Sequence, residues 1–345
     1  MRKLTRALLL AALCGAGAFA QIGADFVVTL TGDGEGLVIT RYTGKAAQIR
    51  FPAAIEGLPV REIGSGREED PVAGPGITGV VIPAGVTKIN AYAFYNPGNE
   101  LASVTIPEGV TEIGKNAFPG ALFTSVTLPK SLTSIGEAAF AFTKLSSITI
   151  PPGVTEIMNS TFWGCENLTT VTISGGVEIG WGAFKDCPSL TTVILPAGLQ
   201  TISGEAFMGC TSLAAVTLPA GLQTIEERAF WDCISLRSVI FPAGLQSISY
   251  QAFENCSSLT ALALPAGLQT IGEMAFRNCT SLTTVTYPDT IQITGFDAGW
   301  GGDSAARAFE NCPRLSPASR AALRKLDELA AANRERAEAA KAQDQ

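Results

Sequence analysis

The second half of the chain repeats one pattern with a period of 23 residues. Four successive copies read LTTVILPAGLQTISGEAFMGC from Leu190, LAAVTLPAGLQTIEERAFWDC from Leu213, LRSVIFPAGLQSISYQAFENC from Leu236 and LTALALPAGLQTIGEMAFRNC from Leu259. A fixed period of this length is the signature of a solenoid, in which similar coils stack on one another. Proteins of this architecture usually hold and recognise other molecules.

The same register extends towards the N-terminus. An Ala-Phe or Thr-Phe pair recurs, with its phenylalanine at Phe94, Phe118, Phe140, Phe162, Phe184, Phe207, Phe230, Phe253, Phe276 and Phe309. We therefore expect a β-rich solenoid of about ten coils of 22–24 residues, from Ile77 to Cys312. A degenerate coil should precede them around Ile49, Phe51 and Ile63.

Each coil is expected to contain a short strand, a turn and an irregular or one-turn helical segment. In one copy Val216 and Leu218 alternate with Thr217, which is the period of a half-buried strand. Pro219 ends the strand because proline has no N–H for the ladder. Short strands should therefore lie on one face. One coil buries too little to offset its backbone entropy, so stability must come from stacking.

One coil carries the full set of repeat residues, at Cys210, Leu213, Val216, Leu218, Pro219, Leu222, Ile225, Ala229 and Phe230. This pattern resembles the BspA-like bacterial leucine-rich repeats, over roughly residues 77–315. The resemblance implies a leucine-rich repeat fold. It also implies a secreted or cell-surface protein of a host-associated microbe that binds host matrix proteins or other cells and contributes to virulence. It implies no particular ligand.

The N-terminal end has the features of an export signal. Basic residues precede an apolar stretch and a small-x-small cleavage site at residues 18–20, so residues 1–20 are interpreted as a signal peptide. Cys14 leaves lipidation open as an alternative, although the bulky Leu13 disfavours it. Residues 21–76 are expected to form a β-rich cap with the degenerate first repeat, including a hairpin of Phe26–Leu30 and Leu37–Ile39.

The C-terminal boundaries follow from helix signals. Residues 77–315 form the predicted repeat solenoid, and residues 316–345 a C-terminal helix and tail. Ser316 and Pro317 are typical of the N-cap and first position of a helix. Leu323, Leu326 and Leu329 then form a stripe that should cover the last coil. No large apolar residue follows Ala330, so the helix is expected to fray there.

Composition excludes several classes of function. The chain has no histidine, which removes histidine-activated nucleophiles and histidine-ligated metals. We therefore expect no enzyme, no cofactor and no metal site. Removing the signal peptide changes the net charge from −7 to −10. An acidic chain is a poor nucleic-acid binder, and no later apolar segment is long enough to span a membrane.

Seven cysteines occupy one position of successive coils, at Cys165, Cys187, Cys210, Cys233, Cys256, Cys279 and Cys312. Neighbours in stacked coils would lie at about 5 Å, within disulfide range. Their parallel stacking and lack of C-x-x-C spacing favour an inward ladder of small apolar groups instead.

The outward positions of the predicted strands carry no charge in ten coils. This favours a partner-binding face or a self-association face, although β-propensity alone and an ice-binding plane remain alternatives. The residues at its centre are Thr170, Thr172, Thr192, Ile194, Ala215, Thr217, Ser238, Ile240, Ala261 and Ala263.

One insertion breaks the array, within Thr290 to Ala306. Phe296 and Trp300 are candidates for an exposed aromatic anchor or for a loop that covers the core. Asp297 and Asp303 permit calcium binding only weakly, because their spacing matches no calcium motif.

These observations predict an exported leucine-rich repeat protein that mediates protein–protein interaction, as an adhesin to host matrix or other cells. The alternative is a structural protein of the cell envelope that self-assembles into an oligomer and has no external ligand.

Overall fold

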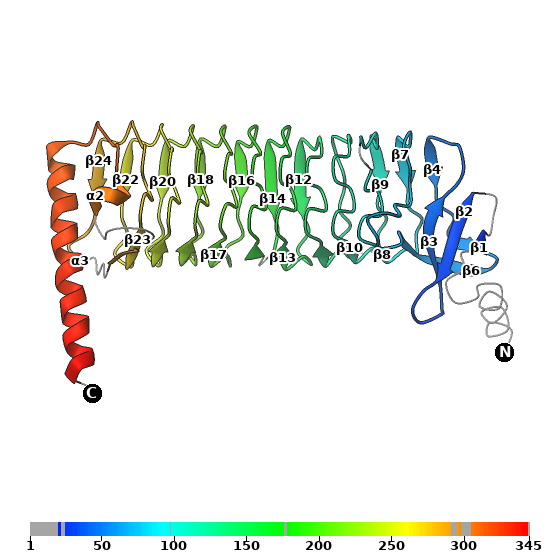
Figure 1. Cartoon of the computed structure of the whole chain (residues 1–345), viewed down its shortest axis with the longest axis horizontal. Helices are drawn as coiled ribbons and strands as arrows, with labels where there is room; N and C mark the ends of the chain where they lie inside the picture. Colours follow the sequence, from blue (N-terminus) through cyan, green and yellow to red (C-terminus); the bar gives the residue numbers. More distant parts are fainter. Residues whose placement is uncertain are drawn as a thin grey trace. The chain divides into compact units, whose positions relative to one another are not determined.

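The computed structural model describes residues 20–21, 25–96, 98–175, 178–290, 295–297 and 305–343 (Figure 1). The chain divides into two compact units, Met1–Val154 and Thr155–Gln345. Each unit is a stack of coils built from short strands, and the chain holds about 11 turns in all. The predicted β-rich solenoid is therefore confirmed.

In the first unit an antiparallel hairpin leads into the coils. β2 (Phe26–Leu30) pairs with β3 (Leu37–Tyr42), which confirms the predicted hairpin, and β1 (Ala20–Gln21) pairs with β2. β3 then pairs in parallel with β6 (Leu58–Ile63), against which β5 (Ala54–Ile55) folds back. The hairpin thus extends the sheet of the coils. It covers the N-terminal end of the apolar core, which would otherwise be open to solvent.

The coils of this unit contribute two strand lines. The first strand line, which the sequence predicts, contains β4 (Gln48–Arg50), β7 (Gly79–Val81), β9 (Ser103–Thr105) and β12 (Ser147–Ile150). The second strand line contains β6, β8 (Lys88–Ile89), β10 (Glu112–Ile113) and β11 (Ser134–Ile135). Neighbouring strands are parallel, as in β7–β9 and β8–β10.

The second unit has the same two lines. Its first strand line contains β14 (Thr170–Ile173), β16 (Thr192–Ile194), β18 (Ala215–Thr217), β20 (Ser238–Ile240), β22 (Ala261–Ala263) and β24 (Thr284–Thr286). Its second strand line contains β13 (Glu156–Ile157), β15 (Glu178–Ile179), β17 (Thr201–Ile202), β19 (Thr224–Ile225), β21 (Ser247–Ile248), β23 (Thr270–Gly272) and β25 (Gly295–Asp297).

The second strand line is the main difference from the sequence-based expectation, which left this segment irregular. Most of its strands are two residues long, too short for an alternating pattern to appear in the sequence. Every strand of this line except β25 contributes a buried isoleucine, such as Ile225, which is fully buried. Ladder bonds to the coils on both sides hold these short strands in parallel register.

Stacked phenylalanines form the centre of the core. In the second unit the rings of Phe207 and Phe230 are 5.4 Å apart and inclined by 13°, and those of Phe230 and Phe253 are 5.1 Å apart and inclined by 8°. In the first unit Phe94 and Phe118 stack at 5.1 Å. All five side chains are at most 2% exposed. Each ring is buried only because the coils beside it are present.

The seven cysteines form no disulfide bonds and are buried, as the ladder interpretation predicts. From Cys187 onwards each thiol donates a hydrogen bond to the phenylalanine carbonyl oxygen of the preceding coil; the Sγ of Cys233 lies 3.3 Å from the oxygen of Phe207. Burial raises the pKa of Cys210 to about 12 and that of Cys312 to about 11. The thiols therefore tie neighbouring coils together and stay protonated.

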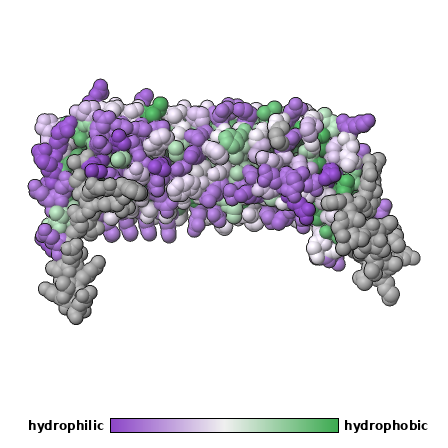
Figure 2. All heavy atoms as spheres, in the orientation of Figure 1, coloured by the Kyte–Doolittle hydropathy of each residue, from purple (hydrophilic) through white to green (hydrophobic). Residues whose placement is uncertain are grey.

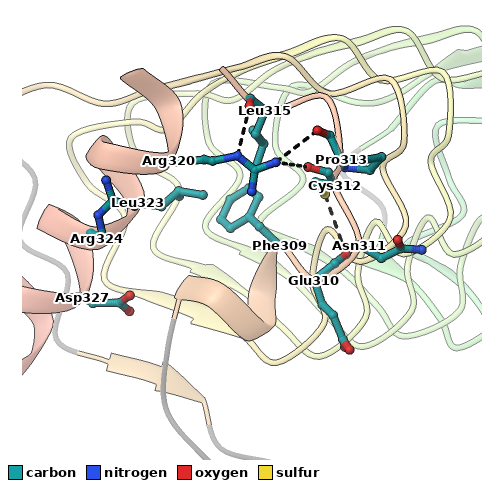
Figure 3. A pocket seen from close by; sticks show the side chains of 10 residues that line it. All are labelled: Phe309, Glu310, Asn311, Cys312, Pro313, Leu315, Arg320, Leu323, Arg324 and Asp327. Carbon is teal, nitrogen blue, oxygen red and sulfur yellow. Dashed lines mark hydrogen bonds between the residues drawn. The ribbon is translucent and has the colours of Figure 1, made fainter. Parts of the chain in front are cut away.

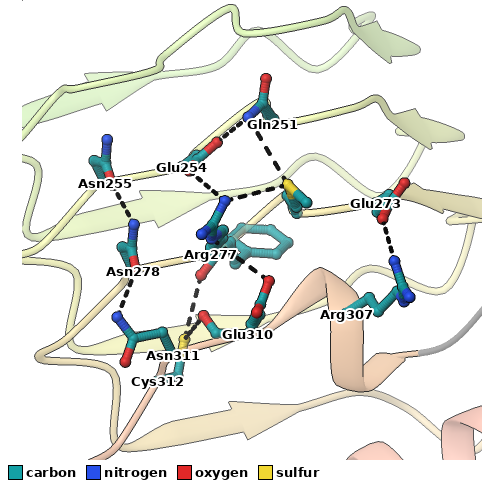
Figure 4. Close-up of polar contacts among 12 residues, drawn as sticks. Gln251, Glu254, Asn255, Glu273, Arg277, Asn278, Arg307, Glu310, Asn311 and Cys312 are labelled. Atoms are coloured by element: carbon teal, nitrogen blue, oxygen red, sulfur yellow. Dashed lines mark hydrogen bonds and ion pairs between the residues drawn. The ribbon is translucent and has the colours of Figure 1, made fainter. Parts of the chain in front are cut away.

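The position before each cysteine adopts a left-handed backbone, which favours Asn, Asp or Gly. The φ angles of Asp232, Asn255, Asn278 and Asn311 are 59°, 63°, 59° and 56°. Their side chains form a ladder between coils (Figure 4), in which Nδ2 of Asn278 donates to Oδ1 of Asn255 at 2.7 Å. Nδ2 of Asn311 donates to Oδ1 of Asn278 at 2.6 Å. Sequence periodicity did not reveal this ladder.

The C-terminal helix α3 (Pro317–Gln343) begins where the sequence predicts. Ser316 Oγ accepts the backbone N–H of Ser319 at 3.1 Å, which is an N-cap bond. Leu323 and Leu326 are buried and Leu329 is half-buried. The helix continues past Ala330 to Gln343, through alanine, glutamate, arginine and lysine residues that have a high helix propensity. The expected fraying after Ala330 stays a prediction.

We expect the seven buried thiols to resist a thiol reagent in the native protein and to react fully after denaturation without reductant. A buried thiol with a raised pKa forms almost no thiolate, the reactive species. Mass spectrometry of the alkylated chain measures this. Fewer than seven modified residues among Cys165 to Cys312 after denaturation would reveal disulfides and contradict the ladder.

Alkaline pH should destabilise the fold through the same thiols. Because the folded pKa of Cys210 is about 12 and the ordinary value is 9.0, the unfolded chain loses its proton first. The free energy of unfolding should therefore fall as pH rises above about 9. Urea unfolding of Cys210→Ala should show a shallower loss between pH 9 and 11 than the parent protein. Equal slopes would show that this thiol does not titrate differently in the two states.

The asparagine ladder predicts a difference between two substitutions at residue 278. Asn278→Gly removes the amide bonds but fits the left-handed backbone, whereas Asn278→Ala also strains it. We expect Asn278→Ala to cost about 2–3 kcal/mol and Asn278→Gly about 1 kcal/mol less. Urea unfolding monitored by circular dichroism measures both. Equal losses would show that the backbone conformation contributes nothing.

Candidate partner-binding face

The strand face of the second unit consists of ten outward residues of β14, β16, β18, β20 and β22: Thr170, Thr172, Thr192, Ile194, Ala215, Thr217, Ser238, Ile240, Ala261 and Ala263. Eight are exposed, and Thr170 and Thr172 are half-buried. The structure thus brings all ten sequence-predicted residues onto one side of the coils.

Alternation along each strand produces this face. The residues between the outward ones point into the core and are at most 8% exposed, at Val171, Val193, Val216, Val239 and Leu262. β-Branched residues dominate both sides and suit the extended backbone. A proline follows β16, β18, β20 and β22 within two residues and stops each strand. The face is therefore only about three residues wide.

Parallel pairing aligns equivalent residues of successive coils. Thr170 lies opposite Thr192, and Thr217 lies opposite Ile240. Strands in such a sheet are about 4.8 Å apart, so each outward column is a dense row of small side chains. Next to the face, Thr191 Oγ1 donates to the carbonyl oxygen of Thr169 at 3.1 Å. Hydroxyls of this kind fix neighbouring coils in register.

Two large apolar side chains stand out of this row. Ile240 is 82% exposed and Ile194 is 53% exposed. Burying such a side chain in a contact would stabilise the complex by about 1.5–3 kcal/mol relative to leaving it in water. None of the ten residues is charged, so a partner that docked here would remove no charge from water. The face therefore has the physical properties of a protein contact surface.

The loop candidates are only partly placed. Phe296 belongs to β25 and lies opposite Ile271 of β23, so its backbone continues the second strand line. Trp300 and Asp303 lie outside the described residues, as does the side chain of Phe296. The aromatic anchor therefore stays a prediction.

Charged and aromatic side chains of the second unit gather instead around the Ala-Phe pairs. Lys185 contacts Glu205 at 2.7 Å, and Arg307 contacts Glu273 at 2.8 Å. Figure 4 shows that several of these contacts connect neighbouring coils near Arg277. Burial raises the pKa of the Glu254 carboxyl against the opposing effect of Arg277. We call the surface that carries these residues, among them Lys185, Glu205, Glu273 and Arg307, the Ala-Phe side.

The Ala-Phe side also carries most of the rare large residues. Trp181 is 42% exposed, Trp163 is 36% exposed, and Trp231 is half-buried. Sequence analysis missed this concentration, although the signal was present: each of the three tryptophans lies within three residues of an Ala-Phe or Thr-Phe phenylalanine. Figure 2 shows one side of the molecule, on which hydrophilic residues predominate and hydrophobic ones are scattered.

A hollow of about 390 Å³ lies between the last coil and α3 (Figure 3). It is lined by Phe309, Leu315, Arg320 and Leu323, among others. The guanidinium of Arg320 donates to the carbonyl oxygens of Leu315 at 3.2 Å and Pro313 at 3.1 Å. This arginine satisfies backbone groups where the last coil meets the helix, which is a structural role.

The described residues contain no group of three metal-ligating side chains. In that part of the chain no helix is both long enough and apolar enough to cross a membrane.

Comparison with known proteins places the chain in a family. The family model described as BspA type leucine rich repeat region matches residues 73–187 and 177–299, in six copies. A search of curated proteins finds no match.

Solved structures of other bacterial repeat proteins are similar to this chain. A leucine-rich repeat protein from Bacteroides ovatus is 22% identical, with a TM-score of 0.47, covering 85% of this chain and 92% of its own. The T. pallidum leucine rich repeat protein is 23% identical, with a TM-score of 0.41, covering 88% and 94%. A leucine rich cell surface protein from Faecalibacterium prausnitzii is 22% identical, with a TM-score of 0.35, covering 79% and 95%.

The family match spans well over half of the chain and agrees with the repeat register and the coil structure. Repeat proteins of this type are associated with protein–protein interaction or a surface role, and their solenoids are typically non-enzymatic. The chain belongs to the BspA-type leucine-rich repeat family.

Proposed function

We propose that the chain is an exported protein that binds a protein partner through the strand face, as an adhesin to host matrix or to other cells. The observation that supports this most is the exposed, uncharged strand face with Ile194 and Ile240 at 53% and 82% exposure. Interface cores are depleted in charged residues, whereas ordinary protein surfaces carry them.

The contact would depend on shape and apolar area. The strand face is held in place by parallel pairing within β14–β16 and β18–β20 and by the buried residues beneath it, such as Val216 and Val239. A rigid surface loses little conformational entropy on binding. The partner should therefore present a complementary surface with few charges.

Export is supported by the N-terminal sequence. Arg2, Lys3 and Arg6 precede the apolar stretch from Ala7 to Ala16, in the order typical of a secretory signal. Fractionation of cells that produce the full chain tests this directly. Retention of the uncleaved chain in the cytoplasm would contradict export.

Self-assembly is the second candidate, because the same exposed isoleucines could be covered by another copy of the chain. The two functions differ in what occupies the strand face of the purified protein. Light scattering should show a monomer for an adhesin and a defined oligomer for an assembling protein. Binding of the monomer to purified extracellular-matrix proteins, measured by surface plasmon resonance, then tests adhesion.

Placing charges on the strand face should separate folding from binding. Thr217→Lys with Ile240→Glu should leave the unfolding midpoint nearly unchanged, because both side chains point to solvent and lie opposite each other. The same pair should weaken partner binding at least about tenfold, or dissociate an oligomer, because the charges must be desolvated in the contact.

A matched control carries the same charges elsewhere on the same coils. Gln223→Lys with Gln246→Glu changes two exposed residues beside the second strand line. This variant should keep both binding and mass. If the strand-face pair and the control behave alike, the strand face is not the contact surface.

A further inference from the structure

Trp181 lies on the Ala-Phe side and has no role in the strand face. Its side chain is 42% exposed, which is high for the largest apolar residue. Its backbone N–H donates to Oδ1 of Asn159 at 2.9 Å, so the residue is anchored to the preceding coil. The core does not need the indole, since Phe184 fills the interior of this coil.

Gly204 of the next coil holds the indole in place. A Cβ at residue 204 would overlap the six-membered ring of Trp181, so only glycine leaves room for the ring there. The N–H of Gly204 donates to Oε2 of Glu226 at 3.0 Å, which fixes this backbone. One part of the indole is therefore supported by a fixed backbone while the rest is open to solvent.

A polar hollow of about 510 Å³ lies beside this platform, on the second strand line. It is lined by Glu178, Gln200, Thr201, Ser203 and Glu226, among others. Ser203 precedes Gly204 in the chain, and Glu226 binds the N–H of Gly204, so hollow and platform are contiguous. The volume falls within the range of small-molecule sites, about 300–1,000 Å³.

The lining groups have unused hydrogen-bonding capacity. In the described ranges the side chains of Glu178, Gln200, Thr201 and Ser203 make no hydrogen bond to the protein, and Glu226 uses one oxygen for Gly204. The two glutamate carboxylates would repel an anionic ligand. The amide of Gln200 and the hydroxyls of Thr201 and Ser203 offer both hydrogen-bond donors and acceptors. The hollow suits a neutral ligand rich in hydroxyl groups.

We propose that Trp181 and this hollow form a binding site for a neutral saccharide. A sugar ring carries a face of C–H groups, which the negative face of an indole attracts, and a rim of hydroxyls for carboxylate and amide oxygens. Stacked coils repeat at about 4.8 Å, close to the length of one sugar unit in an extended glycan.

The test is titration of the full chain with neutral hexasaccharides of glucose, mannose, xylose and N-acetylglucosamine, followed by calorimetry and tryptophan fluorescence. At least one should bind with a Kd below about 1 mM. Trp181→Ala should weaken that binding at least about tenfold, and Trp181→Phe less, because a phenyl ring keeps part of the platform. Gly204→Ala should also weaken it, because the added methyl group displaces the indole.

Two controls separate this site from the others. Thr217→Lys with Ile240→Glu should leave saccharide binding unchanged, and Trp181→Ala should leave protein binding through the strand face unchanged. Thermal unfolding of each variant shows whether the fold is intact. Each of the two proposals can therefore be refuted while the other stands.

Three outcomes would overturn the saccharide site. The first is that the protein binds none of the hexasaccharides, and the second is that it binds one with equal affinity after Trp181→Ala. Alternatively, hexalysine could bind instead and be released by Glu178→Gln with Glu226→Gln, which would assign the hollow to a basic peptide.

Discussion

Packing of each coil against its neighbours is the interaction on which the rest of the structure depends. Phe230 packs between the rings of Phe207 and Phe253 of the neighbouring coils, at 5.4 and 5.1 Å. The short strands, the thiol bonds and the asparagine ladder likewise satisfy their polar groups between coils. A coil that lost its neighbours would expose both apolar and polar groups, so the stack is stable only as a whole.

This constraint separates structural positions from free ones. The inward isoleucines, the phenylalanine and, in the second unit, the cysteine recur because each fits the same place in the next coil. Outward positions face water and are free to vary without loss of packing. Functional residues of a repeat protein must therefore be sought in the outward columns, where a departure from ordinary surface chemistry has no packing explanation.

The sequence predicted the features that depend on side-chain periodicity. The first strand line, the buried phenylalanines, the reduced cysteine ladder and the helix start at Pro317 follow from alternation, spacing and capping rules. It missed features that depend on backbone geometry or on contacts between coils. The strands of the second strand line are too short to show alternation, and the asparagine ladder requires a positive φ that no periodicity shows.

The strand-face residues were predicted from missing charge. Trp181 could be recognised only in the structure, because its contact with Gly204 distinguishes a supported surface residue from a core residue.

The charged residues of the second unit are distributed unevenly between its outward surfaces. Ion pairs such as Lys185–Glu205 connect coils on the Ala-Phe side. The side chains of Lys185 and Glu205 are 26% and 14% exposed, so solvent screens this pair only in part. The carboxylates and the amide of the proposed saccharide site line the hollow on the second strand line. The strand face has no charge that a partner must desolvate, so apolar contact with Ile194 and Ile240 would not be offset by lost hydration. Because only inward packing must repeat from coil to coil, the outward sides are free to differ, and one set of coils carries a charged Ala-Phe side and an uncharged strand face.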